Sequence, residues 1–339
     1  MDLDHEASFV DVLSLGELLI DMFPAEVGRR IWEVTAFQPK PGGAPANVAV
    51  AVARLGLKAA FMGKVGEDLF GHFLADVLAR EGVDVRGVRF DPEVRTTMAV
   101  IGMPDEHSAE FVFYRNPGAD TRLQPEELDV DVLRRARVLH FGSLSLTDEP
   151  ARSATWKAIE IARLGHTLVS YDVNYRPTLW KEPAEAIEQA QALLPKVDLV
   201  KVNETELNLL TGSENLDTGS RSLVEKGPAL CVVTLGEKGS YFRTARGAEF
   251  IPAFRVKTVD AIGCGDSFIA ALLTRLVKDG AWCNPHKVLG QQISVDRLYQ
   301  HLRYANAAGA LTSLKRGVIP ALPNEKEVEE FLARNGNEP

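Results

Sequence analysis

Short apolar runs alternate with amphipathic stretches along most of this chain of 339 residues. The runs are apolar at consecutive positions, which is typical of strands buried on both faces of a parallel sheet. Strands are predicted at Val10–Leu15, Ala59–Val65, Val138–Phe141, Leu168–Asp172, Leu199–Val202 and Leu230–Leu235, and helices at Ala46–Leu55, Phe70–Glu81, Ala151–Leu164, Ala184–Leu194 and Glu204–Leu210. Strands and helices in such alternation predict an α/β fold with a mostly parallel central sheet.

Two segments, residues 18–37 and 95–116, break this alternation. They contain runs such as Thr97–Ile101 and Glu110–Tyr114, in which the two sides of an extended chain differ in polarity. This pattern predicts antiparallel strands with two different faces. We therefore expect an α/β core made of residues 1–17, 38–94 and 117–339, with residues 18–37 and 95–116 inserted as a small β lid.

Composition excludes several classes of protein. The net charge of −9 comes without a basic cluster, which argues against binding to nucleic acids or anionic membranes. Cys231, Cys264 and Cys283 are few and widely spaced, so neither a disulfide framework nor a zinc site is expected. The chain shows no signal peptide and no apolar stretch long enough to span a membrane, so a cytoplasmic location is expected.

A loop bracketed by two glycines lies just before a predicted helix that opens near Gly265. Apolar residues recur at helical spacing from Phe268 to Val277. The first N–H groups of a helix have no internal partner and lie at the positive end of its dipole. Gly263 and Gly265 lack a Cβ, so this loop could lie against a ligand and suits phosphate oxygens. Taken alone, the same spacing also fits a plain tight turn.

Asp266 would repel a phosphate group that was merely bound at this loop. The carboxylate makes chemical sense as a base that takes a proton from a hydroxyl group attacking a phosphoryl group, which is kinase chemistry. Two other glycine motifs are excluded. Phe268 stands where the Rossmann fingerprint has its third glycine, and the chain lacks the Gly-Lys-Ser/Thr of a P-loop.

Two further polar positions could meet a ligand. Gly42 and Gly43 precede a predicted helix, and Asn47 in its first turn offers both a donor and an acceptor. Asp21 lies at the polar end of an apolar run, where its carboxylate could accept hydrogen bonds from two neighbouring sugar hydroxyls. Each also has a structural explanation, since the glycines could form a plain turn and Asp21 could cap one.

Several motifs together resemble the ribokinase-like (PfkB) carbohydrate kinases, and they occur in the order seen in that family. These motifs are Gly16–Asp21, Gly42–Asn47, Asn203–Glu206, Thr234–Gly239 and Val259–Phe268. The resemblance runs from about Val10 to Pro323 and implies a three-layer ribokinase-like sandwich with a small β-sheet lid. Within the family the chain is most similar to the fructokinases, on the segments Arg95–Thr97, Phe111–Asp120, His140–Leu146 and Tyr171–Arg176.

The resemblance implies a role for each matched position. Asp266 would be the base for the sugar hydroxyl, and Arg176 would contact phosphate or a polar end of the substrate. The backbone N–H groups of residues 262–265, including those of Gly263, Cys264 and Gly265, would form an anion hole for the transferring phosphoryl group.

The remaining implied contacts divide between the two substrates. The sugar would be held by Asp21, Gly42, Gly43 and Asn47, with Tyr114 and Arg115 reaching in from the lid. ATP would be held by Asn203, Glu206, Thr234, Gly236, Gly239 and Asn306. Glu206 would also be linked to Mg²⁺ through water, because magnesium commonly keeps several waters and binds few direct protein ligands.

The sequence departs from the family pattern at three places. In the loop before Asp266, Ala261 and Ile262 replace two threonines, and Cys264 replaces an alanine. The glycines and the carboxylate remain, so chemistry through backbone N–H groups should survive, and activation by K⁺ stays open. A thiol at Cys264 would be sensitive to alkylation if reactive and inert if buried. Val173 stands where proline is usual, and residues 281–294 match no motif.

We therefore expect an ATP-dependent sugar kinase that converts D-fructose to fructose 6-phosphate and forms a homodimer through its lid. One alternative is a 2-keto-3-deoxygluconate kinase, in which Arg115 or Arg176 could meet the substrate carboxylate. A ribokinase fits the lid segment 113–115 less well. An alternative from another class is a fructokinase-like protein that binds without catalysis, which the changed residues Ala261 and Ile262 motivate.

Overall fold

The computed structural model describes residues 10–104, 110–165 and 167–335. The strands of its large sheet are β1 (Val10–Leu15), β4 (Ala59–Gly66), β5 (Asp84–Asp91), β8 (Ala136–Gly142), β9 (Leu168–Asp172), β10 (Leu199–Asn203), β11 (Leu230–Thr234), β12 (Gly239–Thr244) and β13 (Gly247–Pro252). The α-helices are α1 (Ala44–Arg54), α2 (Leu69–Arg80), α3 (Val130–Arg135), α4 (Ala151–Leu164), α5 (Pro183–Leu193), α6 (Glu204–Thr211), α7 (Leu216–Glu225), α8 (Cys264–Lys278), α9 (Pro285–Lys287), α10 (Val295–Thr312) and α11 (Glu325–Arg334). Each strand and helix predicted for the core is present, with ends that agree to within two residues.

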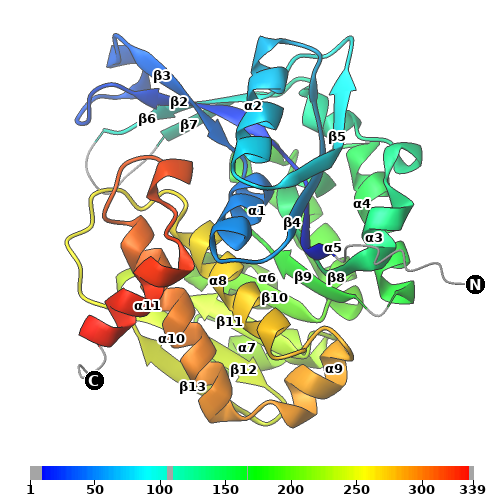
Figure 1. Cartoon of the computed structure of the whole chain (residues 1–339), viewed down its shortest axis with the longest axis vertical. Helices are drawn as coiled ribbons and strands as arrows, with labels where there is room; N and C mark the ends of the chain where they lie inside the picture. Colours follow the sequence, from blue (N-terminus) through cyan, green and yellow to red (C-terminus); the bar gives the residue numbers. More distant parts are fainter. Residues whose placement is uncertain (1–9, 105–109, 166, 336–339) are drawn as a thin grey trace, which may run out of the picture.

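The large sheet has the strand order β13-β12-β11-β10-β9-β8-β1-β4-β5 (Figure 1). All strands from β11 to β5 pair in parallel, whereas β12 and β13 extend the edge as antiparallel strands. The predicted α/β fold with a mostly parallel sheet is therefore confirmed.

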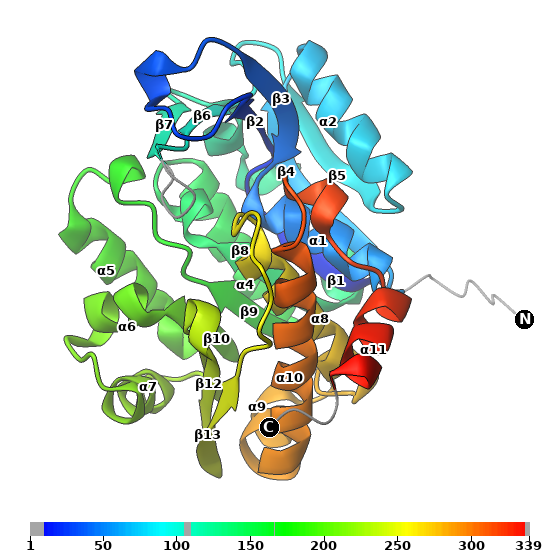
Figure 2. The ribbon, with the colours of Figure 1, turned by 90° about the vertical axis from the view of Figure 1, so that its left-hand side faces the viewer.

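Helices cover both faces of this sheet (Figures 1 and 2). Neighbouring residues on one strand are buried in different cores, as Val12 and Leu13 illustrate. Val12 lies in the core that includes residues of α1, α2, α8 and α10, whereas Leu13 lies in the core that includes residues of α3 to α7. Because both faces are buried, the strands must be apolar at consecutive positions, and the result is a three-layer sandwich.

A smaller four-stranded sheet contains β2 (Leu19–Pro24), β3 (Phe37–Gly42), β6 (Met98–Gly102) and β7 (Glu110–Tyr114), in the order β3-β2-β6-β7. It projects from one end of the molecule (Figure 1). Residues 38–42 lie in this sheet and not in the core to which the sequence assigned them, because Phe37–Gly42 pairs in register with Leu19–Pro24. The two hairpin-like pairs are antiparallel, but β2 and β6 run parallel.

The parallel strands bring several polar residues to one edge of the large sheet. Asp172, Asn203 and Thr234 are the last residues of β9, β10 and β11. The carboxyl ends of parallel strands lie at the same edge, which is where open α/β sheets bind their ligands. Among the helices that the structure describes, none has the length and the apolar character needed to cross a membrane.

Candidate active site

The loop before α8 is held in shape by Asp260 and Gly263. Asp260 is buried, and its carboxylate accepts hydrogen bonds from the N–H groups of Ile262 (3.0 Å) and Gly317 (3.1 Å). Gly263 immediately precedes α8 with φ of 82°, a left-handed conformation that glycine adopts at little cost. A Cβ at Gly263 would also lie 2.4 Å from Cγ1 of Val318. Glycine is therefore required here by both conformation and space.

The free N–H groups of this loop are fewer than the sequence predicted. The N–H of Ile262 donates to Asp260, and that of Cys264 donates to the Ala261 carbonyl at 3.3 Å. By contrast, the N–H groups of Gly263 and Gly265 donate to no residue in the described part of the chain. An anion at the N-terminus of α8 would thus meet Gly263 and Gly265 first, not all of residues 262–265.

The thiol of Cys264 is partly buried. Burial, together with the nearby carboxylates of Asp260 and Asp266, raises its pKa to about 12. Because the thiolate is the form that attacks alkylating reagents, the inert alternative fits this position.

Asp266 lies in the first turn of α8 and faces α1. The side-chain amide of Asn47, in the first turn of α1, donates a hydrogen bond of 2.8 Å to Oδ2 of Asp266. Oδ1 of Asn47 is buried and has no hydrogen-bond partner among the described residues, so it is available to a hydroxyl group of a ligand. Burial raises the pKa of Asp266 to about 6, although the Asn47 hydrogen bond opposes this rise.

Asp21 lies on β2 beside the two glycines that precede α1. A Cβ on Gly42 would lie 2.0 Å from Oδ2 of Asp21, so only glycine leaves room for this carboxylate. Gly43 is the residue before α1 and has φ of 105°. Burial, followed by repulsion from Asp266, raises the pKa of Asp21 to about 7, whereas the charge of Arg176 lowers it. Two carboxylates and one guanidinium therefore share this part of the site.

Asn203 and Glu206 form a capping box at the start of α6. Oδ1 of Asn203 accepts the N–H of Glu206, and Oε2 of Glu206 accepts the N–H of Asn203, both at 2.8 Å. Oε1 of Glu206 accepts the N–H of Tyr175 at 2.8 Å, which fixes the loop that carries Arg176. The partly exposed Arg176 lowers the pKa values of both Asp21 and Asp266 through its charge. Glu206 thus ties the start of α6 to the residue next to Arg176, a contact that its motif does not reveal.

Lys201 and Asp172 form a buried ion pair that sequence reasoning missed. Their Cα atoms are partners on the adjacent strands β10 and β9, and Nζ of Lys201 lies 2.8 Å and 3.0 Å from the two oxygens of Asp172. A Cβ on Gly265 would lie 3.4 Å from Nζ of Lys201, so the pair lies at the N-terminus of α8. A lysine inside an otherwise apolar buried strand was the available signal, because lysine is almost never fully buried without a partner.

The residues predicted to hold the nucleotide lie around the end of β11. Gly236 has φ of 57° and open space where a Cβ would point. Gly239 has φ of 124°, and a Cβ there would lie 2.1 Å from the Ile251 carbonyl oxygen. The amide of Asn306, on α10, donates to the carbonyl groups of Ile251 (3.3 Å) and Pro252 (3.2 Å). Gly239 and Asn306 therefore also hold β13 in place. Thr234 ends β11.

Tyr114 and Arg115 lie at the end of β7 and differ sharply in exposure. Arg115 is buried: its guanidinium donates to Asp120 (2.7 Å), to the hydroxyl of Thr147 (2.7 Å) and to the Leu144 carbonyl (2.9 Å). These bonds fasten the end of β7 to the core and occupy the guanidinium. Tyr114 is 62% exposed. A contact of Tyr114 and Arg115 with the sugar therefore stays a prediction.

Comparison with known proteins gives consistent matches over nearly the whole chain. Residues 10–325 match the model of the pfkB family of carbohydrate kinases. The chain is 45% identical to "Probable fructokinase-2" of Arabidopsis thaliana over 322 residues, which is 95% of each protein. It is also 45% identical to "Fructokinase-2" of Solanum lycopersicum over 324 residues, again 95% of each.

Two solved structures share this architecture. An ATP-bound fructokinase from Xylella fastidiosa superposes with a TM-score of 0.84 at 29% identity, covering 96% of this chain and 99% of that one. A fructokinase from Vibrio cholerae O395, bound to fructose, ADP and calcium, superposes with a TM-score of 0.81 at 32% identity and the same coverage.

Proposed function

Because the chain belongs to the pfkB family of carbohydrate kinases, we propose that it transfers the γ-phosphoryl group of ATP to the 6-hydroxyl of D-fructose. Similarity to plant fructokinases over nearly the full length supports fructose as the sugar. The observation that carries the mechanism is the position of Asp266, at a helix N-terminus with free N–H groups and fixed by Asn47.

In this mechanism, Asp266 accepts a proton, whereas the loop before α8 stabilises negative charge. As the bond between O6 and phosphorus forms and the bond from phosphorus to the β,γ-bridging oxygen breaks, the proton on O6 passes to the Asp266 carboxylate. The N–H groups of Gly263 and Gly265 stabilise the charge on the phosphoryl oxygens. The Asn47 amide holds Oδ2 of Asp266, while Oδ1 accepts no hydrogen bond from a described residue and is available to the sugar hydroxyl.

The charges of this site also fit a divalent cation. In the described part of the chain, no three His, Cys, Asp or Glu side chains come together to hold a metal ion. Magnesium often binds substrate phosphates and water with only one or two protein carboxylates. We propose that Mg²⁺ neutralises charge on the ATP phosphates and that Glu206 and Asn203 contact it through water. Activation by K⁺ and a cytoplasmic location stay predictions.

The identity of the sugar can be tested by comparing turnover. With MgATP and coupled detection of ADP, the purified protein should phosphorylate fructose far more efficiently than glucose, ribose or 2-keto-3-deoxygluconate. Preference for the keto-deoxy acid would keep the mechanism and change the substrate. Nucleotide binding without turnover on any of the sugars would favour the non-catalytic alternative.

Turnover should increase with pH in the mildly acidic range. The base must be ionised, so activity is present above the pKa of Asp266, about 6, and is lost as pH falls through that value. A profile of kcat/KM for fructose should show this rise, broadened by Asp21, whose pKa is about 7. Asn47→Ala removes a hydrogen bond that lowers the pKa of Asp266, so its profile should move to higher pH. A profile that is flat below neutrality would contradict this assignment.

Asp21→Ala should mainly weaken sugar binding. Hydrogen bonds to a charged group contribute roughly 1.5–3 kcal/mol, and about 1.4 kcal/mol is tenfold in affinity, so KM for fructose should rise about 10- to 150-fold. Steady-state kinetics should show a much smaller change in kcat. Asp11→Ala is a matched control. Asp11 is also a buried carboxylate, but it lies on β1 and pairs with Arg137. That variant should keep its fructose KM, and an equal rise in both variants would refute the role of Asp21.

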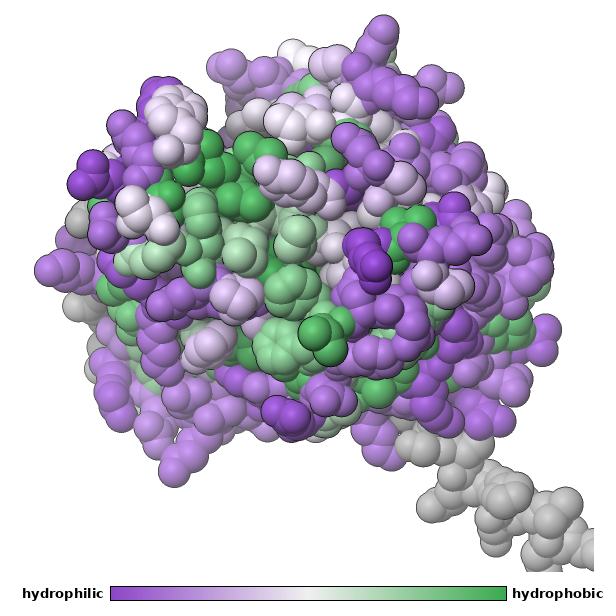
Figure 3. Space-filling model, turned by 90° about the horizontal axis from the view of Figure 1, so that it is seen from above, coloured by the Kyte–Doolittle hydropathy of each residue, from purple (hydrophilic) through white to green (hydrophobic). Residues whose placement is uncertain are grey.

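We propose that the smaller sheet also mediates homodimerisation. On β7, an edge strand of that sheet, Val112 is 45% and Tyr114 is 62% exposed. Trp32 and, on α2, Leu69 are also exposed, and Figure 3 shows hydrophobic residues gathered at this end of the molecule. An unpaired edge with exposed apolar side chains favours pairing with another chain. Sedimentation equilibrium should give the mass of a dimer, and of a monomer after Tyr114→Asp. A wild-type monomer would exclude this interface.

A further inference from the structure

Lys201 is a buried cation for which the proposed mechanism so far has no use. Only 6% of the residue is exposed, and its ammonium group is held by both carboxylate oxygens of Asp172. Lys201 lies on β10, near the carboxyl edge of the sheet, and its Nζ is 3.4 Å from the position that a Cβ on Gly265 would take. The ammonium group therefore lies directly against the first turn of α8.

The ammonium group adds a full positive charge to the N-terminus of α8, and Asp172 is its partner there. The N-terminus of a helix carries partial positive charge, so it attracts anions and repels a cation. Burial tends to lower the pKa of Lys201, but the charges of Asp172 and Glu206 outweigh that effect, and its pKa is raised. Lys201 therefore keeps its proton, and its field adds to that of the unpaired N–H groups of Gly263 and Gly265. Such convergence suits an anion with more than one negative charge.

We propose that Lys201 is a further catalytic residue, whose ammonium group contacts the transferring phosphoryl group beside the N–H groups of Gly263 and Gly265. This inference rests on the proposed function. Lys201 acts as a point charge: it donates hydrogen bonds to phosphoryl oxygens, keeps its proton throughout, and forms no covalent bond. Asp172 is the positioning residue that holds the ammonium group in place.

Lys201→Met should lower kcat by roughly 10²–10³-fold, the loss typical of removing one preorganised donor to a developing anion. KM for fructose should change little, because Asp21 and Asn47 are untouched. A second readout is binding of MgADP, alone and with aluminium fluoride as an analogue of the transferring phosphoryl group. In calorimetry the variant should bind MgADP like the wild type but lose the additional affinity that aluminium fluoride confers in the presence of fructose.

A purely structural role must be separated from this one. Lys201→Met leaves Asp172 buried without its partner, which by itself destabilises a protein. The double variant Lys201→Met/Asp172→Asn removes both charges. We expect it to recover the melting temperature but not kcat or the aluminium fluoride response. Recovery of kcat in the double variant would show that Lys201 only neutralises Asp172, and would overturn the proposal.

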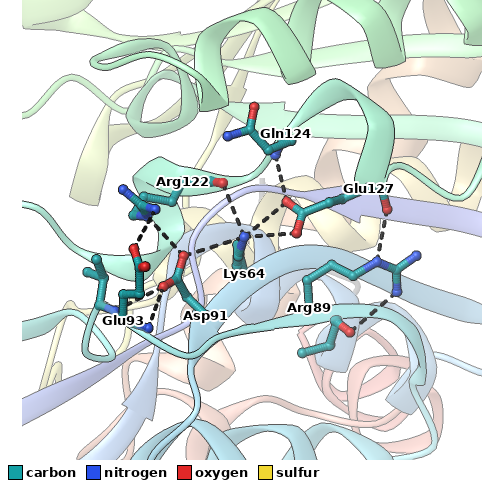
Figure 4. Close-up of polar contacts among 9 residues, drawn as sticks. Lys64, Arg89, Asp91, Glu93, Arg122, Gln124 and Glu127 are labelled. Atoms are coloured by element: carbon teal, nitrogen blue, oxygen red, sulfur yellow. Dashed lines mark hydrogen bonds and ion pairs between the residues drawn. The ribbon is translucent and has the colours of Figure 1, made fainter.

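Lys64 provides a matched control in another part of the molecule. It is a buried lysine on β4, and its Nζ lies 2.8 Å from Glu127 and 3.4 Å from Asp91 (Figure 4). Lys64→Met should lower the melting temperature while kcat stays within about threefold of the wild type. A wild type that phosphorylates no sugar would reject the proposed function, whereas normal kcat in Lys201→Met would reject only the role of Lys201. If no sugar is turned over, the aluminium fluoride response still decides whether Lys201 contacts the anion.

Discussion

Asp266→Ala should lower kcat by ~10²–10⁴-fold, the range that general-base assistance typically contributes. The reason is that O6 of the sugar must lose its proton as it bonds to phosphorus, and Asp266 is the carboxylate that lies at the N-terminus of α8 beside Asn47. KM for fructose should stay within a few-fold, because Asp21 and Asn47 still hold the sugar. Steady-state kinetics with fructose and MgATP measure both quantities.

Asp266→Asn is the conservative companion of this variant. It keeps the size of the side chain and removes the proton acceptor, so the same loss of kcat in both variants would assign the effect to the base. Circular dichroism should show that both variants fold. If either keeps more than about a tenth of the wild-type rate, general-base catalysis by Asp266 is wrong, since the effect would then fall below the range expected of a base.

Gly263→Ala should lower kcat by roughly 10²–10³-fold, because it displaces a donor that stabilises the phosphoryl group. The residue has φ of 82°, and a Cβ there would lie 2.4 Å from Cγ1 of Val318. The loop must shift to relieve this contact, and the N–H groups of Gly263 and Gly265 shift with it. Rapid-quench measurement of a single turnover would locate the loss in the chemical step.

Gly280→Ala is the matched control at the opposite end of the same helix. Gly280 follows α8 with φ of 72°, and nothing lies within 4 Å of the position its Cβ would take. Both substitutions therefore carry a left-handed conformational cost of about 1–2 kcal/mol, but only Gly263→Ala adds a contact and moves the loop. Gly280→Ala should keep wild-type kcat and lose some thermal stability. Equal losses of kcat in the two variants would mean that backbone strain, and not the anion site, accounts for the effect.

Most strands of the large sheet, and helices such as α1 and α4, could be predicted because each depends on a local pattern. Continuous apolar runs such as Leu168–Asp172 identify strands buried on both faces, and the two glycines before Phe268 identify the start of α8. The edge strands β5 and β13 were not predicted, because their sequences are mixed and partly exposed, and β12 was also missed. The extent of β3 was also missed, since only its pairing with β2 shows that residues 38–42 belong to the smaller sheet.

The sequence shows which polar groups the site contains. It does not show which of them the fold pairs with other residues. The N–H of Ile262 was expected to bind an anion, but it donates a hydrogen bond to the Asp260 carboxylate instead. Arg115 was expected to reach a sugar, but its hydrogen bonds to Asp120, Thr147 and the Leu144 carbonyl were not foreseen. Lys201 and Asp172 meet only because β9 and β10 are neighbours in register. Such long-range pairings are not contained in any local pattern.

The position of the phosphoryl group in the product tests the central claim most directly. Fructose and MgATP should be incubated with the wild type and, in parallel, with Asp266→Ala, and the products identified by phosphorus and carbon NMR. The account predicts fructose 6-phosphate from the wild type and almost none from the variant. Phosphorylation at O1, or undiminished fructose 6-phosphate from Asp266→Ala, would contradict the proposed placement of the sugar against its base.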